Sequence, residues 1–237
     1  MRIGIYGGTF NPIHRGHLTA AAAAAKQLCL DKLLLVPDAI PPHKPLPAGS
    51  ADAADRLEMV QLCTGELPVP AEVTDLELRR QGASYSCDTL AALREQYPAD
   101  ELFFLMGSDM FLSFETWRRP EEICRLATLA VFSRRTADEA AAFARQKKKL
   151  EKAFSARVTV VMNPEVIEVS STQLREELAR GRGRAYLTEP VYGYILRKGL
   201  YGTATDLKHL TPEELRPIAL SYLKPKRMPH VLGTEQE

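Results

Sequence analysis

The segment GGTFNPIHRGHL, residues 7–18, places two histidines three positions apart, shortly after a pair of glycines. Imidazoles at this spacing suit three kinds of chemistry: holding a metal ion, carrying protons, or gripping an anion. In a helix, residues three apart share one face, so His14 and His17 would act together on whatever lies there. The alternative is structural, with one histidine capping a helix and the other packed in the core.

The residues around the two histidines favour an anion. Gly7 and Gly8 follow the apolar stretch MRIGIY and would let the backbone come close to a ligand. The helix expected next offers free N–H groups and the positive end of its dipole, which attract anions and repel metal ions. Gly16 removes a side chain where a phosphate could approach. No Glu or Asp stands at metal-ligand spacing, so we expect no metal bound by protein side chains here.

Apolar runs of strand length alternate with helix-like stretches along most of the chain. We expect strands at 1–6, 31–38, 69–80, 128–135 and 157–162 and in the run 101–109, where the strand breaks at Gly107. We expect helices at 15–29, 52–64, 83–96, 120–127, 137–154 and after residue 170. Runs such as DKLLLVPD (31–38) are almost entirely apolar, as is typical of strands buried on both faces of a parallel sheet. The alternation predicts an α/β fold with a doubly wound parallel sheet.

Small and polar residues gather where the expected strands end. These segments are GGTF (7–10), PPHK (41–44), GSD (107–109) and SST (170–172). Ligands of doubly wound sheets bind beyond the carboxyl ends of the strands. The sequence therefore predicts one ligand site that draws on all four segments.

Composition restricts the classes of function. The chain has 31 Lys and Arg against 30 Asp and Glu, a net charge of +1, which excludes a chain-wide surface for nucleic acid but allows a local basic pocket. The longest apolar stretches are about as long as a strand, and no signal peptide precedes MRIGIYGG, so we expect no membrane association. Cys29, Cys63, Cys87 and Cys124 are far apart, which predicts reduced thiols in a cytoplasmic protein without a zinc site.

The first motif closely resembles the signature of the nucleotidylyltransferase superfamily, in the form found in the bacterial nicotinate-nucleotide adenylyltransferases. Five further segments match that family in order: PPHK, GASYSCDTL (82–90), GSDMFLSFETW (107–117), VSSTQLR (169–175), with Leu174 for the usual Ile, and EPVYGYILRKGLY (189–201). The resemblance covers residues 1 to about 202. It predicts a Rossmann-like nucleotidylyltransferase domain over 1–202, followed by a linker or tail over 203–237.

The resemblance implies an enzyme of NAD biosynthesis with two small-molecule substrates. It would transfer the AMP part of ATP to nicotinate mononucleotide by direct in-line displacement, giving deamido-NAD and pyrophosphate, with Mg²⁺ as the metal ion. The scarcity of clustered carboxylates favours magnesium held by ATP, and magnesium held by the protein stays open as the alternative. The attacking phosphate monoester has a second pKa of about 6 and is largely dianionic already. Neither a protein nucleophile nor a strong general base is needed, because alignment and charge neutralisation at the α-phosphate suffice.

The resemblance also assigns the ATP site. His14 and His17 contact the phosphates, with His17 closest to the α-phosphate in the transition state. The helix end lowers the pKa of both imidazoles and a bound polyanion raises it, and we expect the polyanion to dominate. Ser171, Thr172 and Arg175 bind the β- and γ-phosphates or form an ordinary helix cap. The complete predicted ATP site is Gly7, Gly8, Thr9, Phe10, His14, His17, Ser171, Thr172 and Arg175.

Three residues predicted to lie near the acceptor nucleotide each have a functional and a structural interpretation. Lys44, in a Pro-rich loop at 40–50, contacts substrate and completes the catalytic set with the two histidines and Arg175, or it is a solvated lysine. Asp109 binds a ribose hydroxyl, lies near the metal, or caps a helix. Trp117, the sole tryptophan, stacks on the pyridine ring or anchors the core.

Selecting a carboxylate over an amide requires hydrogen-bond donors without facing acceptors. Ser84, Tyr85 and Ser86, with backbone amides near residues 117 and 118, are the candidates. The family commonly has Tyr where Arg118 stands. This arginine either favours the acid through its charge or points to solvent.

Two other functions remain open at this stage. One is adenylation of a different phosphorylated acceptor, nicotinamide mononucleotide or phosphopantetheine. The other is a nucleotide-sensing module that kept the fold and lost catalysis, against which the intact His14, His17, Lys44 and Arg175 count. The oligomeric state is not predicted.

The last residues raise a separate expectation. KPKRMPHVLGTEQE (224–237) resembles the opening of a bacterial HD-domain phosphohydrolase family, in which the residue matching His230 is the first metal ligand. The chain would then be one half of a fusion to an HD domain. The alternative is a disordered tail, and both predict no hydrolase activity in this chain.

Overall fold

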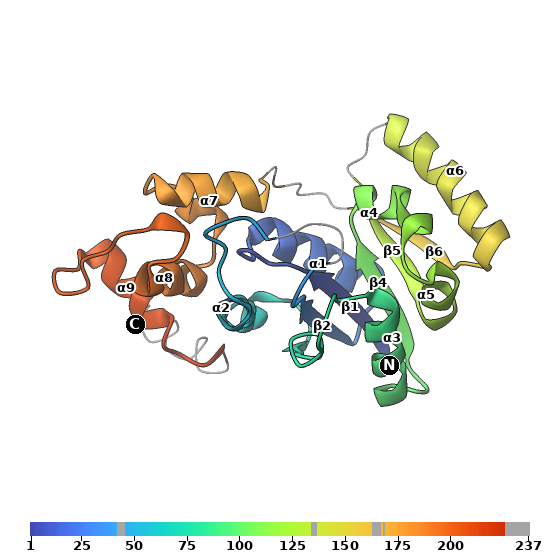
Figure 1. Cartoon of the computed structure of the whole chain (residues 1–237), viewed down its shortest axis with the longest axis horizontal. Helices are drawn as coiled ribbons and strands as arrows, with labels where there is room; N and C mark the ends of the chain where they lie inside the picture. The colour runs from blue at the N-terminus through green and yellow to red at the C-terminus, as the bar shows by residue number, and fades with distance from the viewer. Residues whose placement is uncertain (42–45, 134–136, 163–166, 168, 226–237) are drawn as a thin grey trace.

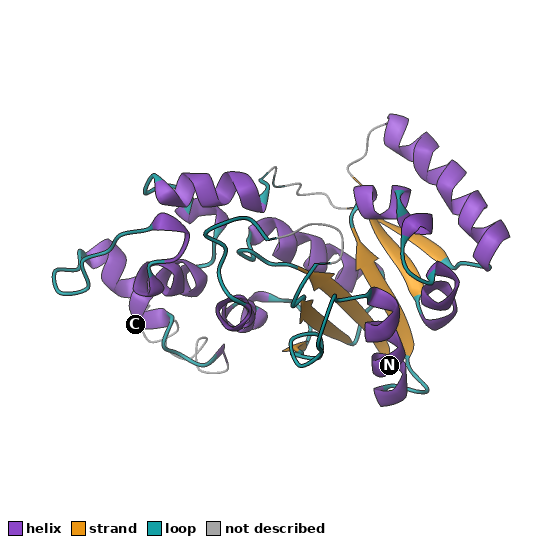
Figure 2. Cartoon of the chain, viewed as in Figure 1, coloured by secondary structure: helices purple, strands orange, loops and turns teal. Residues whose placement is uncertain are grey.

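The computed structural model describes residues 1–41, 46–133, 137–162, 167 and 169–225. Within them a parallel sheet forms the centre, with strand order β3-β2-β1-β4-β5-β6 (Figures 1 and 2). Its strands are β1 (Arg2–Gly8), β2 (Lys32–Pro37), β3 (Ala71–Val73), β4 (Glu101–Met106), β5 (Thr128–Ser133) and β6 (Val158–Met162). The chain starts mid-sheet, winds outward to β3, then returns to β4 and winds the other way. The predicted doubly wound parallel sheet is thereby confirmed, and β1 and β4 flank the switch point.

Helices cover both faces of the sheet (Figure 2). The helices are α1 (Arg15–Gln27), α2 (Ala53–Leu62), α3 (Ser86–Gln96), α4 (Ser108–Leu112), α5 (Pro120–Leu126), α6 (Ala137–Phe154), α7 (Ser171–Ala179), α8 (Glu189–Lys198) and α9 (Pro212–Leu220), with 3₁₀ turns at Thr64–Glu66, Phe114–Thr116, Arg184–Tyr186 and Leu200–Gly202. One core joins α1, α2, α7 and α8 to the sheet, and a second joins α3, α5 and α6 to its other face. The C-terminal helices and α6 lie at opposite ends of the molecule (Figure 1).

The apolar runs form strands because they fill both cores at once. In β2, Leu33 and Leu35 belong to the first core and Leu34 and Val36 to the second, as the alternation of strand side chains requires. The alanine-rich α1 packs closely on the first face through Ala21 and Ala24, and other small residues beside them. Among the described residues no helix is long and apolar enough to cross a bilayer.

Two predicted element boundaries are wrong, each for a local reason. The strand expected at 69–80 stops at Val73, because the hydroxyl of Thr74 accepts a hydrogen bond from the backbone N–H of Leu76 and the chain turns. The helix expected at 83–96 begins only at Ser86, because the backbone N–H of Ser84 donates to the carbonyl of Ile40 and ties this stretch to the loop after β2.

Part of the predicted tail packs against the sheet domain. A Cβ on Gly193 of α8 would lie 1.8 Å from the carbonyl oxygen of Pro217 in α9, so the two helices touch at backbone distance. Residues 226–237, with His230, lie outside the described residues. The division of the chain at residue 202 stays a prediction.

Candidate functional site

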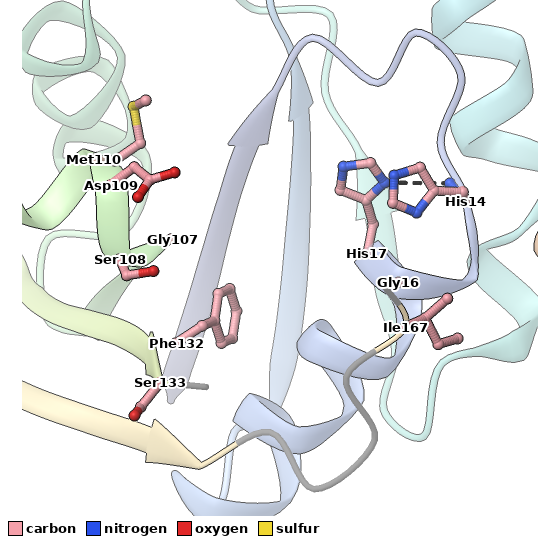
Figure 3. A pocket seen from close by; sticks show the side chains of 10 residues that line it. All are labelled: His14, Gly16, His17, Gly107, Ser108, Asp109, Met110, Phe132, Ser133 and Ile167. Atoms are coloured by element: carbon pink, nitrogen blue, oxygen red, sulfur yellow. Dashed lines mark hydrogen bonds between the residues drawn. The ribbon is translucent and has the colours of Figure 1, made fainter. Parts of the chain in front are cut away.

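The carboxyl ends of β1, β4 and β5 border a cavity of about 250 Å³, which we call the histidine hollow (Figure 3). It is lined by His14, Gly16, His17, Gly107, Ser108, Asp109, Met110, Phe132, Ser133 and Ile167. His17 and Asp109 lie on opposite sides of it (Figure 3). Of the four segments predicted to form one ligand site, those after β1 and β4 meet at this hollow, and the ligand site itself stays a prediction.

The two histidines mark the start of α1. His14 is the N-cap residue in an extended conformation and His17 lies in the first turn. Their rings lie 3.8 Å apart between centroids, and the ring of Phe10 packs edge-on to His17 at 5.3 Å. Tyr6 borders the same imidazole at 6.2 Å. His17 therefore stands in an aromatic surround that excludes water from most of its ring.

A hydrogen bond fixes the tautomer of His17. The backbone N–H of His14 donates to Nδ1 of His17 at 3.2 Å, so neutral His17 carries its proton on Nε2. Burial lowers the pKa of His14 to about 4, and burial together with the neighbouring imidazole lowers the pKa of His17 well below its usual range. Without a bound anion both rings are neutral at pH 7, and His17 presents an Nε2–H donor.

The lowered pKa values predict a pH-dependent stability. Between about pH 6.5 and 4 a histidine is protonated in the unfolded chain while folded His14 is not, so the unfolding free energy falls as pH falls. Burial raises the pKa of Asp38 and Glu77, and groups shifted in this direction make the unfolding free energy rise as pH falls. A variant is therefore needed to isolate the contribution of His14. When the pH is lowered from 6.5 to 4.5, the unfolding free energy of His14→Gln, measured in denaturant, should fall by about 2 kcal/mol less than that of the wild type. Equal losses would contradict the lowered pKa.

Gly16 makes room for an imidazole rather than only for a ligand. A Cβ at this position would lie 3.0 Å from Nδ1 of His14 and 3.1 Å from its Cε1, so the ring would have to shift. From the sequence, the only role predicted for Gly16 is to let a phosphate approach.

Gly16→Ala should separate stability from activity. Glycine to alanine within a helix adds up to about 1 kcal/mol of stability, and the shift of the buried His14 ring that the new Cβ requires offsets that gain. The same shift should lower kcat about tenfold. Thermal unfolding and steady-state kinetics on one preparation test both effects. Unchanged kcat would show that the position of His14 is not critical.

The loop between β1 and α1 is held by a buried arginine. Arg56 of α2 is fully buried, and its Nη1 donates to the carbonyl of Thr9 at 2.7 Å and to Asp38 at 3.2 Å. The hydroxyl of Thr9 donates to the same carboxylate at 2.7 Å. Phe10 is 2% exposed and supports His17 by packing. Thr9 and Phe10 thus shape the site, and direct contact of either with a nucleotide stays a prediction.

The start of α7 lies beside the same loop. Its N-cap is Ser170, which forms a capping box with Gln173, so the cap does not use Ser171 or Thr172. The hydroxyl of Ser171 donates to the carbonyl of Pro12 at 3.4 Å. Arg175 donates to the carbonyl of Asn11 at 2.8 Å and to Thr172 at 3.2 Å. A guanidinium has five donors, so these contacts leave capacity for a phosphate.

A second cavity of about 320 Å³, the aromatic hollow, adjoins the first. Its lining comes from residues 6–9, 38, 41, 77, 84–86, 104–107, 110, 117, 118 and 123. Trp117 packs against Phe104 at 6.1 Å and Phe114 at 5.4 Å, so it is both a wall of the hollow and part of the second core. The guanidinium of Arg118 lies 4.5 Å from the ring centroid of Tyr85. That contact places the exposed Arg118 at the edge of the hollow, and its role in favouring the acid stays a prediction.

Ser84 lines the aromatic hollow and also forms hydrogen bonds to the neighbouring loops. Its hydroxyl accepts from the backbone N–H of Ala39 at 3.0 Å, and it bonds the buried carboxylate of Glu77. Thr89 donates to the same carboxylate at 2.6 Å. Sequence reasoning missed Glu77, because nothing in VTDLELRR distinguishes a buried glutamate from an exposed one.

Gly107 and Met110 line both hollows. Gly107 has φ −74° and ψ 164°, which suit any residue, and no atom lies within 4 Å of a Cβ built on it. The backbone therefore does not require glycine here, and the residue borders both hollows with open space beside it. Asp109 lies in the first turn of α4, whose N-cap is Gly107, so its predicted alternative as a helix cap is wrong.

Other lining residues were not foreseen from the sequence. Phe132 and Ser133 end β5, and the hydroxyl of Ser133 donates to Glu139 at 2.9 Å. Ile167 and Met110 complete the apolar part of the histidine hollow. Lys44 lies outside the described residues, and its role stays a prediction.

The described side chains do not fit a protein-held magnesium ion. Among them no three His, Cys, Asp or Glu side chains lie close enough together to hold a metal. Asp109 is the single carboxylate among the residues that line the histidine hollow. No step of the chemistry is therefore derived through a protein-bound metal.

Comparisons with known proteins agree with this geometry. Residues 5–177 match the cytidylyltransferase-like family. The chain is 43% identical over 205 residues to a probable nicotinate-nucleotide adenylyltransferase of Gloeobacter violaceus, covering 84% of this chain and 96% of that protein. It is also 43% identical to one from Thermus thermophilus, covering 85% of this chain and all of that protein.

A solved structure shares the fold. The nicotinic acid mononucleotide adenylyltransferase of Plasmodium falciparum, in complex with NaAD, superposes with a TM-score of 0.69 at 19% identity, covering 86% of this chain and 99% of that chain. Identity this low shows the fold alone, whereas the two curated relatives establish membership at the level of sequence. The chain therefore belongs to the cytidylyltransferase-like family and, within it, to the nicotinate-nucleotide adenylyltransferases.

Proposed function

We propose that this chain transfers the adenylyl group of ATP to nicotinate mononucleotide and releases pyrophosphate. The observation that carries the proposal is the pair of adjoining hollows, which share Gly107 and Met110 at the end of β4. One hollow offers imidazoles and a helix N-terminus, which suit a triphosphate. The other offers aromatic walls and a guanidinium, which suit an aromatic acid. Their junction is where the bond between the two nucleotides would form.

ATP occupies the histidine hollow in this proposal. Its α-phosphate lies at His14 and His17 and accepts the Nε2–H of His17. Its β- and γ-phosphates extend towards Ser171, Thr172 and Arg175, whose contacts with residues 11 and 12 bring α7 beside the loop that ends at His14. Magnesium enters with the phosphates as part of the ATP complex, since the described side chains form no site for it.

Nicotinate mononucleotide occupies the aromatic hollow, with its ring against Trp117. Its carboxylate faces Arg118 and the first turn of α3, which begins at Ser86 and offers backbone N–H donors. Tyr85 supports the arginine by stacking, and Ser84 holds the neighbouring loop. Asp109, which lines the histidine hollow, binds a ribose hydroxyl. Lys44 contacts the substrate phosphates.

The reaction is a single displacement at phosphorus. A phosphate oxygen of nicotinate mononucleotide attacks the α-phosphorus, and the bond to the β-phosphate oxygen breaks as pyrophosphate leaves. The attacking group is already ionised, so no side chain needs to remove a proton. His17 stabilises the charge on the α-phosphate oxygens through its fixed Nε2–H, and a bound polyanion raises its pKa towards the cationic form. The described residues supply charge and alignment. We infer a cytoplasmic location, as for other enzymes that use these free nucleotides.

Pyrophosphate release with three acceptor conditions tests the function. The enzyme is assayed with ATP and nicotinate mononucleotide, with ATP and nicotinamide mononucleotide, and with ATP alone. We expect release that depends on an acceptor and is fastest with the acid. Preference for the amide would assign a different acceptor, and absence of product with the acid would refute the proposal.

A further inference from the structure

We propose that Tyr201 is a positioning residue for adenylyl transfer, acting through Asn11 on the loop that carries His14 and His17. The proposal rests on the function proposed above. It concerns a tyrosine 190 residues away from Asn11 in the sequence, whose hydroxyl donates to Oδ1 of Asn11 at 2.9 Å.

Asn11 is the buried centre of the β1–α1 loop. Its side chain is 3% exposed, and Oδ1 also accepts from the backbone N–H of Ala51 at 3.3 Å. Its Nδ2 donates to the hydroxyl of Ser50 at 2.8 Å, and its carbonyl accepts from Arg175. The side chain of Asn11 thereby joins the loop to the residues just before α2, and its backbone carbonyl joins the loop to α7.

The histidines depend on these tethers because residues 9–14 form no strand or helix that would fix them. His14 follows Asn11 by three residues, and His17 is fixed in turn by the backbone N–H of His14. A shift of Asn11 would therefore pass directly to both imidazoles. Misplacing a catalytic group by about 1 Å can cost about 10² in rate.

Tyr201 makes this contact with its backbone in an energetically unfavourable conformation. It has φ +56° and ψ 32°, a left-handed conformation that is unfavourable for a tyrosine, and its side chain is 7% exposed. Burial raises the pKa of its hydroxyl, so the group stays protonated and donates to Asn11. The strained backbone is retained where the side chain reaches the loop, which fits a positioning role.

Tyr194 provides a matched control. It belongs to α8, in the same C-terminal part of the chain, and its hydroxyl donates to Asp55 at 2.7 Å. Tyr194→Phe and Tyr201→Phe delete the same atom and a similar hydrogen bond. The two variants differ in that the Tyr194 contact does not involve the loop of residues 9–14.

Steady-state kinetics and thermal unfolding of both variants test the proposal. Tyr201→Phe should lower kcat about tenfold, leave KM for ATP within about twofold, and change the unfolding temperature no more than Tyr194→Phe does. Tyr194→Phe should keep the wild-type kcat. Equal kcat values for the two variants, whether both high or both low, would overturn the proposal.

A double-mutant cycle sharpens the test. If Tyr201 acts through Asn11, Tyr201→Phe should cost no further activity in an Asn11→Ala background. Additive losses in kcat would show that Tyr201 acts by another route. Tyr201→Phe alone still decides the question if Asn11→Ala does not fold.

Imidazole NMR gives a readout that does not require the acceptor. The ring resonances of His14 and His17, assigned with single His→Gln variants, should shift in Tyr201→Phe and stay unchanged in Tyr194→Phe. Unchanged resonances in both would overturn the positioning role. If the wild-type enzyme instead failed to use nicotinate mononucleotide, the proposed function would fail while this test remained decisive for the loop.

Discussion

His17→Ala is expected to lower kcat by a factor of about 10² to 10³ while raising KM for ATP much less. Removing one preorganised donor to a developing anion typically has a kinetic effect of this size. The hydrogen bond from the backbone N–H of His14 fixes the Nε2–H tautomer of His17, and the rings of Tyr6 and Phe10 shield part of its imidazole from water, which strengthens such a donor. ATP keeps its other predicted contacts, so binding should suffer less than turnover.

A surface histidine supplies the control for this experiment. His209 has a side chain 82% exposed and pairs with Asp206 at 2.8 Å, away from the lining of both hollows. His209→Ala should retain wild-type kcat and KM. Turnover of His17→Ala within a few-fold of wild type would show that this imidazole is not part of the catalytic site.

Gly107→Val is expected to abolish most activity at a small cost in stability. Its backbone angles suit any residue and the position of its Cβ is empty, so the variant should fold and lose only the preference for glycine at the N-cap of α4, about 1 kcal/mol. Because the glycine lines both hollows, the added carbons would block the junction where the two substrates meet. We expect kcat/KM to fall by about 10² or more, with Gly107→Ala intermediate. Kinetics and thermal unfolding of the series measure both effects.

Gly65→Ala is the matched control for the milder variant. A Cβ there would meet its nearest neighbour, the carbonyl of Pro225, at an ordinary 3.6 Å, and Gly65 lines neither hollow. It should leave kcat/KM unchanged. An active Gly107→Val variant would contradict the view that the substrates meet beside Gly107.

The central strands could be predicted from the sequence because burial on both faces leaves a continuous apolar run, as in β2 and β4. The edge strand β3 could not be bounded in this way. It pairs on one side, and its end is decided by Thr74, whose hydroxyl captures the backbone N–H of Leu76. Local polar competition of this kind leaves no signal in hydrophobic periodicity.

The site could be predicted as far as it is encoded in contiguous motifs. His14 and His17 lie together because helical spacing requires it, and the strand ends converge because the sheet is parallel. The identity of the cap on α7 was missed, since Ser170, Ser171 and Thr172 are chemically equivalent until Gln173 completes a box with the first.

Contacts between distant segments could not be predicted from the sequence. The bond from Tyr201 to Asn11 depends on how α8 and the turn after it pack on the first core, and the presence of Phe132 in the hollow depends on the register of β5 against β4. Both follow from tertiary packing, which no single segment specifies.

The stereochemical course at the α-phosphorus tests the central claim most directly, namely that His14 and His17 act as charge clamps in a single displacement. One diastereomer of ATP with sulfur on the α-phosphate is converted with nicotinate mononucleotide, and the configuration of the dinucleotide product is determined. A single in-line attack predicts inversion. Retention would mean two displacements through a covalent adenylyl-enzyme and would contradict the assignment of these histidines as electrostatic groups.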